Sequence, residues 1–255
     1  MRIITCNLNG IRAAAKKGFF SWVISQNPDF ICVQETKAQM NTLDLKELYL
    51  AGYYHYFSDA VKKGYSGVGI YSKSKPDKII TKMELDWADD EGRYIEIIVD
   101  DLHIISTYFP SGSSGDLRQD LKYEFMSHFE KFQLADIISK KKSAVICGDI
   151  NIVHTEKDIK NWRSNQKNSG CLPQEREWLE HCFSNLGFLD AFRQKNNNHD
   201  EYSWWSNRGR AWENNVGWRI DYQILSPNFE LVTDKVKIYK EQRFSDHAPC
   251  IFDYI

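Results

Sequence analysis

The chain has 255 residues, of which 42% are hydrophobic and 14% aromatic, and it carries a formal net charge of −2 with a pI near 6.4. This length and apolar content can fill one sizeable core, so we expect a single domain over residues 1–255. No apolar run approaches the ~18 residues of a membrane span, and the charge lacks the basic excess usual for nucleic-acid-binding proteins.

The amino terminus leads directly into an apolar strand instead of the apolar segment of a signal peptide. The six cysteines form no CxxC pair, and four of them lie within or beside apolar runs, where a reduced thiol acts as a small hydrophobic group. A zinc site is the less favoured alternative, because such sites use closely spaced Cys and His pairs. We therefore expect reduced, structural cysteines and a cytoplasmic protein.

Eight apolar runs predict strands, in chain order at residues 2–6, 30–33, 67–71, 94–99, 103–108, 144–147, 220–225 and 250–253. Helical periodicity occurs at 123–142 and at 174–186, and Gly187 provides the stop of the second helix. The apolar residues expected on one face of the first helix are Phe125, Phe129, Phe132 and Ile137. The mixed order of strands and helices, with several direct strand connections, predicts an α/β sandwich.

Acidic and amide side chains lie next to four of these apolar runs. In chain order they are Asn7 and Asn9, then Glu35, then Asp149 and Asn151, and finally Asp246 followed by His247. Carboxylates and amides are hard oxygen donors suited to Mg²⁺ or Mn²⁺, and an imidazole titrates near neutral pH. An isolated Gly-Asp pair more often ends a strand in a turn, but four such strand ends together favour metal-assisted phosphodiester cleavage.

Six motifs follow one another between Asn7 and His247: Asn-x-Asn-Gly, Gln-Glu-Thr-Lys, Tyr-x-Pro, Gly-Asp-x-Asn, Gly-Trp-Arg-x-Asp-Tyr and Ser-Asp-His. Because the six motifs occur in this order, the chain resembles the exodeoxyribonuclease III family of abasic-site endonucleases, which belongs to the endonuclease/exonuclease/phosphatase superfamily. The resemblance covers essentially the whole length of the chain. The resemblance implies a DNase I-like fold, a four-layer α/β sandwich in which two packed mixed sheets are flanked by helices.

The same resemblance implies an activity. The expected enzyme is Mg²⁺-dependent, with Mn²⁺ as a substitute, and hydrolyses the phosphodiester 5′ to an abasic site in duplex DNA. Accessory 3′–5′ exonuclease activity would trim blocked 3′ ends, which places the protein in base excision repair. We expect a monomer.

The resemblance also implies residue roles. Glu35 is the principal metal ligand, and the other residues of the metal site are Asn7, Asn9, Asp149, Asn151, Asp246 and His247. The catalytic residues that it implies are Tyr108, Asp149, Asn151, Asp221 and His247. Tyr108 and Asn151 would contact the phosphate, and Asp221 would orient the ring of His247. Asp149 is our preferred general base, with His247 as the alternative; Tyr108 could also be an ordinary strand-end aromatic and the asparagines turn caps.

Three tryptophans lie near the carboxyl-terminal motifs. The resemblance implies that Trp204 and Trp218 wall a pocket for a flipped-out, base-free deoxyribose. The alternative is core packing, because a buried tryptophan contributes a large apolar area. We favour the core for Trp205 and the pocket for the other two.

Basic residues cluster locally in spite of the net charge. Arg208 and Arg210 lie in a loop that we expect to enter a groove of the duplex, and Lys63 and Tyr65 lie in a glycine-containing loop that resembles a DNA-contacting loop of the family. These basic clusters could follow a phosphate backbone, or could form a solvated surface. They comprise Lys62 and Lys63; Lys157, Lys160, Arg163 and Lys167; and Arg208, Arg210 and Arg219.

Two other functions agree with parts of the sequence. One is a relative with the same catalytic layout, either a nonspecific DNase or a phosphatase acting on inositol or lipid phosphates. The other is a DNA-binding scaffold with a silent site, because fold alone does not establish activity. The aromatic residues argue against the first alternative, and the complete set of acidic, amide and imidazole residues argues against the second.

Overall fold

The computed structural model describes residues 1–43 and 48–255, which form two six-stranded mixed sheets packed face to face. The strands of the first sheet, in spatial order, are β13 (Thr233–Ile238), β14 (Cys250–Tyr254), β1 (Arg2–Asn7), β2 (Phe30–Gln34), β4 (Val68–Ser72) and β3 (Tyr54–Ser58). Those of the second sheet are β5 (Lys78–Ile80), β6 (Tyr94–Val99), β7 (Leu102–Tyr108), β8 (Ser143–Asp149), β12 (Asp221–Leu225) and β9 (Leu189–Asp190).

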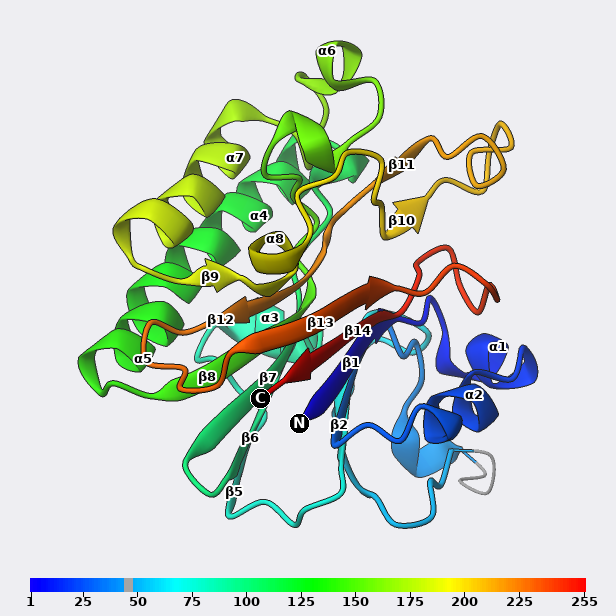
Figure 1. Ribbon diagram of the computed structural model, residues 1–255, viewed down its shortest axis with the longest axis vertical. Coiled ribbons are helices and arrows are strands. Elements are labelled where there is room, and N and C mark those ends of the chain that lie inside the picture. The colour runs from blue at the N-terminus through cyan, green and yellow to red at the C-terminus, as the bar shows by residue number, and fades with distance from the viewer. Residues whose placement is uncertain (44–47) are drawn as a thin grey trace.

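Helices cover the outer faces of both sheets (Figure 1). Helices α1 (Ile11–Lys16) and α2 (Phe19–Ser25) pack on the first sheet, and α4 (Asp116–His128), α5 (Ala135–Ser139) and α7 (Pro173–Glu180) pack on the second. The remaining helices and turns are short: η1 (Met40–Thr42), α3 (Asp86–Asp90), η3 (Gly112–Ser114), η5 (Glu156–Asp158), α6 (Trp162–Asn165) and α8 (Ala191–Lys195). The predicted four-layer sandwich is therefore confirmed.

The side chains of the central strands alternate between two cores, as the period of a β-strand requires. In β8, Val145 and Cys147 face the core between the sheets, whereas Ala144 and Ile146 face the core beneath the helices of the second sheet. Strands buried on both faces read as continuous apolar runs, which explains why the sequence predicted them. All six cysteines are buried free thiols, as expected.

One helix prediction was wrong in a detail. Phe125, Phe129 and Ile137 are buried as predicted, but Phe132 is 57% exposed. The reason is the π-helical segment η4 (Phe129–Leu134), which continues α4. Each residue of a π turn advances less around the helix axis than in an α-helix, so Phe132 turns away from the core and Leu134 takes the buried position.

The second predicted helix is confirmed as α7 followed by η6 (His181–Asn185), and Gly187 ends it with a φ of 79°. A short two-stranded ribbon, β10 (Trp204–Trp205) and β11 (Gly217–Trp218), stands apart from both sheets (Figure 1). Within residues 1–43 and 48–255, no helix is long and apolar enough to span a membrane.

Candidate active site

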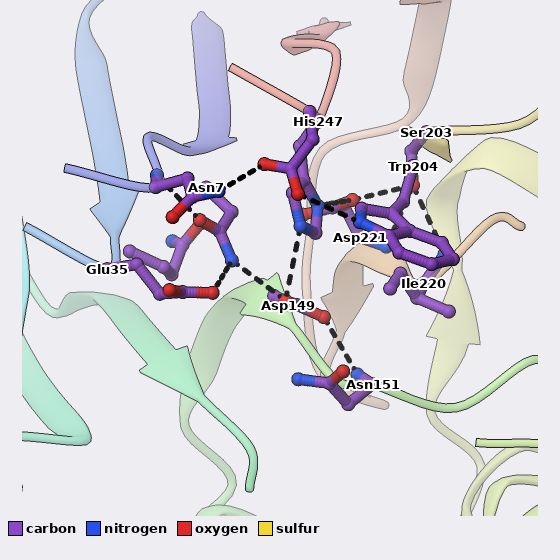
Figure 2. A network of polar contacts seen from close by, with 12 residues as sticks. Asn7, Glu35, Asp149, Asn151, Ser203, Trp204, Ile220, Asp221 and His247 are labelled. Carbon is purple, nitrogen blue, oxygen red and sulfur yellow. Dashed lines mark hydrogen bonds and ion pairs between the residues drawn. The ribbon is translucent and has the colours of Figure 1, made fainter. Parts of the chain in front are cut away.

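The predicted site residues meet at one edge of the two sheets. Asn7, Tyr108 and Asp149 are the last residues of β1, β7 and β8, and Glu35 directly follows β2. Strand β12 runs antiparallel to β8, so its first residue, Asp221, lies opposite Asp149 in register. Because these strand termini all point to the same edge, groups from distant parts of the sequence face one another, as Figure 2 shows.

Asn7 connects two of the carboxylates. Its buried amide nitrogen donates to Glu35 Oε1 at 2.8 Å and to Asp149 Oδ2 at 2.9 Å (Figure 2). Lys37 Nζ lies 2.7 Å from Glu35 Oε2. Burial by itself would raise the pKa of Glu35, but the charge and hydrogen bond of Lys37, the hydrogen bond from Asn7 and the charge of His247 together outweigh burial and lower it, so Glu35 remains an anion.

His247 lies between two aspartates. Its Nδ1 is 2.8 Å from Asp221 Oδ2, and its Nε2 is 3.8 Å from Asp149 Oδ2. Burial opposes the charged ring, but Asp221 and Asp149 outweigh burial and raise the pKa of His247 to about 10. Burial, together with the charges of Asp221 and Glu35, raises the pKa of Asp149 to about 8 in spite of His247. This buried network therefore holds a cationic imidazole beside a carboxyl group that titrates near neutral pH.

The donor set fits a hard divalent cation. One possible ligand atom from each of Glu35, Asp149 and His247 lies within 4.8 Å of the other two. The two carboxylates supply the oxygen ligands that Mg²⁺ and Mn²⁺ prefer. Asn9 and Asp246 form an adjacent pair, in which Asn9 Nδ2 donates to Asp246 Oδ1 at 2.8 Å and Asn9 Oδ1 accepts from Lys37.

Tyr108 and Asn151 line the same cleft as these groups. Burial and the neighbouring Glu35 raise the pKa of Tyr108 well above its usual range, so its phenol stays protonated and can donate a hydrogen bond. Asn151 has a φ of 57°, its backbone N–H donates to Asp149 Oδ1 at 2.9 Å, and its side-chain nitrogen donates to the Phe109 carbonyl at 2.9 Å.

The cleft has a volume of about 670 Å³ and one aromatic wall. Trp204 and Trp218 are cross-strand partners in the β10–β11 ribbon, with ring centroids 6.0 Å apart at an interplanar angle of 89°. Trp204 Nε1 donates to Asp246 Oδ2 at 3.2 Å, which ties this wall to the polar network. Trp205 is only 1% exposed, so its predicted place in the core is confirmed.

Comparison with known proteins identifies the family. Residues 4–247 match the Endonuclease/Exonuclease/phosphatase family. The chain belongs to this family. A Bacillus subtilis (strain 168) exodeoxyribonuclease is 36% identical over 98% of this chain and 97% of its own length. A DNA-(apurinic or apyrimidinic site) endonuclease of Dictyostelium discoideum is 34% identical over 98% of this chain and 69% of its own length.

A 3′–5′ exonuclease from Neisseria meningitidis has the same fold, with a TM-score of 0.89, 25% identity, and coverage of 100% of this chain and 99% of that chain. These matches confirm the resemblance predicted from the six motifs. They also confirm the predicted enzyme class, which is that of a metal-dependent phosphodiester hydrolase.

One expected surface cation is buried. Arg219 is 1% exposed, and its guanidinium lies 2.7 Å from Asp158 Oδ1 and 2.7 Å from Asp190 Oδ2. Burial would raise the pKa of Asp158, but Arg219 and Arg193 outweigh it and hold that pKa well below its usual range. The interpretation of Arg219 as a phosphate-tracking surface residue was therefore wrong, because this guanidinium is already neutralised in the interior.

The other predicted DNA contacts, Arg208, Arg210, Lys63 and Tyr65, lie on loops and are not among the residues that line the cleft. Arg208 and Arg210 are exposed in the loop between β10 and β11, and Lys63 is exposed in the loop before β4. Tyr65 is half-buried, and its hydroxyl accepts a hydrogen bond of 3.0 Å from Arg118.

Two residues beside the site received no role from the sequence. Lys37 contacts Glu35 and Asn9. Ser203 is buried, and its hydroxyl donates to Asp221 Oδ2 at 2.6 Å. The signal for Lys37 was present, since it closes the Gln-Glu-Thr-Lys motif, whereas Ser203 lies in a stretch that was noted only for its aromatic residues.

Proposed function

We propose that this chain is an endonuclease that hydrolyses the phosphodiester 5′ to an abasic site in duplex DNA, with accessory 3′-end trimming in base excision repair. The observation that carries the proposal is the single cleft in which the Asp149–His247–Asp221 network faces the Trp204–Trp218 wall. Similarity to the Dictyostelium apurinic or apyrimidinic site endonuclease supports the incision activity, and similarity to the Bacillus exodeoxyribonuclease supports the trimming activity. The proposed enzyme is a cytoplasmic, single-domain monomer over residues 1–255.

We propose Glu35 and Asp149 as the carboxylates that hold the divalent ion, with Asn7 fixing their separation. A bound Mg²⁺, or Mn²⁺ in its place, would withdraw charge from the phosphoryl oxygens. Asn9 and Asp246 would complete the outer part of this site through water. His247 is proposed to contribute charge instead of a ligand, because its Nδ1 is bound to Asp221 and its ring is cationic.

Hydrolysis forms a bond between the oxygen of water and phosphorus and breaks the bond from phosphorus to the 3′ oxygen, which leaves as the 3′ hydroxyl after taking up a proton from solvent. Asp149 is the proposed acceptor of the water proton, because burial and the charges of Asp221 and Glu35 raise its pKa and make its carboxylate a stronger base than an exposed aspartate. The imidazolium of His247, the phenol of Tyr108 and the amide of Asn151 are the proposed donors to the phosphate oxygens, where negative charge builds up.

The aromatic wall is the proposed source of selectivity. A deoxyribose without a base presents a small apolar face that would pack against Trp204 and Trp218, and the proposal is that these rings exclude a nucleotide that still carries its base. Exposed Arg208, Arg210 and Lys63 would contact backbone phosphates on either side, with Tyr65 supporting the loop that carries Lys63.

The test compares a labelled duplex containing one tetrahydrofuran abasic analogue with the intact duplex, each in Mg²⁺ and in EDTA. Metal-dependent incision only beside the analogue is the expected result. Digestion of both duplexes from their 3′ ends would instead indicate a general exonuclease. Absence of cleavage in Mg²⁺ and in Mn²⁺ would refute the proposal, and release of phosphate from inositol or lipid substrates would then identify a phosphatase.

A further inference from the structure

A buried ion pair lies behind the wall of the cleft, between α4 and α7. Lys122 and Glu175 are both fully buried, and Lys122 Nζ lies 2.6 Å from Glu175 Oε1. Removing two opposite charges from water costs about as much as their attraction returns, so a pair of this kind adds little net stability. Its contacts with the cleft suggest another role.

The ammonium group holds the backbone of a residue in the cleft. Lys122 Nζ donates to the carbonyl oxygen of Asn151 at 2.8 Å. Asn151 has left-handed backbone geometry, with a φ of 57°, which is a costly conformation unless the surrounding structure fixes it. The buried lysine therefore helps to fix the residue whose side-chain amide is the proposed phosphate contact.

The carboxylate holds the loops of the same wall. Glu175 Oε2 accepts from the backbone N–H groups of Gly170 at 2.6 Å and Leu172 at 3.0 Å, and Oε1 accepts from Gln119 Nε2 at 3.1 Å. Gln119 in turn packs against Gly112, where an added Cβ would lie 1.9 Å from Gln119 Oε1. One carboxylate thus connects the 167–172 loop to the serine-rich 111–115 loop.

We infer that the Lys122–Glu175 pair is a positioning device for DNA binding, which sets Asn151 and both loops of the wall before the substrate arrives. Neither residue touches the reacting atoms. Order that exists before binding reduces the entropy lost on association, so the pair acts on affinity. The inference rests on the proposed function, since it takes duplex DNA as the ligand of the cleft.

The experiment measures the Kd for the tetrahydrofuran duplex by fluorescence anisotropy in EDTA, and kcat and KM in Mg²⁺, together with thermal unfolding. The variants are Lys122→Met, Glu175→Leu, the double variant Lys122→Met/Glu175→Leu, and Lys122→Arg. Each single variant leaves one buried charge uncompensated and should lose stability. The double variant removes both charges and should recover the part of this loss that comes from the uncompensated charge.

The double variant distinguishes the two roles. If the pair were only structural, restored stability would bring back wild-type binding. The positioning role predicts that Kd and KM stay raised about tenfold, which corresponds to about 1.4 kcal/mol and is of the order of the cost of immobilising one side chain on binding. The reason is that the Asn151 carbonyl and the Gly170 N–H still lack their partners, so the wall must become ordered when DNA binds. The fall in kcat should be smaller, since Asp149 and His247 keep their contacts with Asn7 and Asp221.

Several outcomes would overturn the inference. One is a folded double variant with wild-type Kd, and another is loss of kcat with Kd and KM unchanged. Lys122→Arg keeps the cation and should bind nearly as wild type. If the double variant does not fold, Gln119→Ala cuts one link from Glu175 without exposing a buried charge, and an unchanged Kd there would refute the role. If wild type binds the duplex but does not incise it, the proposed function fails and the positioning role remains testable through Kd.

Discussion

Replacement of Asp221 by Asn tests how far the cationic state of His247 contributes to catalysis. The two side chains are at most 4% exposed, and Asp221 Oδ2 accepts from His247 Nδ1 at 2.8 Å. Solvent screening is therefore weak, and a charge-assisted hydrogen bond of this kind contributes about 1.5–3 kcal/mol. At about 1.36 kcal/mol for each factor of ten, Asp221→Asn should lower kcat/KM about 10- to 150-fold.

The same variant should change the pH profile in one direction. Asp221 is a main cause of the raised pKa of His247, which is about 10 in the wild type, so His247 stays charged throughout the neutral range. Without that carboxylate, burial still disfavours the charge, and the pKa of His247 should fall. The alkaline limb of the kcat/KM profile should then move to lower pH, since the ring loses its proton earlier as pH rises.

A matched control separates this effect from a loss of folding. Glu96 is a buried carboxylate that contacts His103 Nδ1, and His103 lies near the start of β7, at the opposite end of that strand from Tyr108. Glu96→Gln makes the same isosteric change in a histidine–carboxylate pair, and it should alter thermal stability without moving the pH profile. An Asp221→Asn enzyme with wild-type kcat/KM and an unmoved alkaline limb would refute the reasoning.

Three further predictions concern metal, DNA and stability. Glu35→Ala should weaken Mg²⁺ binding in a calorimetric titration, with activity partly restored by excess Mn²⁺; full activity without metal would contradict it. The double variant Arg208→Ala/Arg210→Ala should reduce the slope of log K against log salt for abasic duplex by about 2, and an unchanged slope would show that neither contacts phosphate. Arg219→Met should lower the free energy of unfolding by about 3–5 kcal/mol in urea titrations, because it leaves buried Asp158 without its main cation, whereas a surface residue would change it little.

The interior strands could be predicted from the sequence, whereas the edge strands could not. The run at 94–99 coincides with β6, because both of its faces are covered and its side chains are mostly apolar. Strand β13, at the edge of the first sheet, was not predicted, because exposed Lys235 and Lys237 interrupt its apolar pattern. Charged residues are common on edge strands because they discourage pairing with other chains, and they remove the signal that would reveal the strand.

The site residues also fall into two groups. Some could be assigned from their own motif, and others depend on residues that are far away in the sequence. Glu35 and Asp149 are carboxylates within short motifs, so they could be predicted as site residues from the sequence. Arg219 could not be assigned in that way, because its burial depends on Asp158 and Asp190, which are 61 and 29 residues away. A run of basic residues does not reveal which cation is already paired in the interior, and only the folded arrangement makes that distinction.

The register of two strands fixes the geometry of the catalytic network. Asp221 pairs with Asp149 across β12 and β8, and a shift of one residue would turn every side chain of β12 to the opposite face. Asp221 would then leave His247, and Tyr222 would leave the core beneath the helices. The apolar residues that bury β12 therefore also hold the carboxylate that charges His247. Arg208 and Lys63 lie in loops outside the two sheets and are free of this constraint, so substrate preference can change within the fold while the chemistry of the strand ends stays fixed.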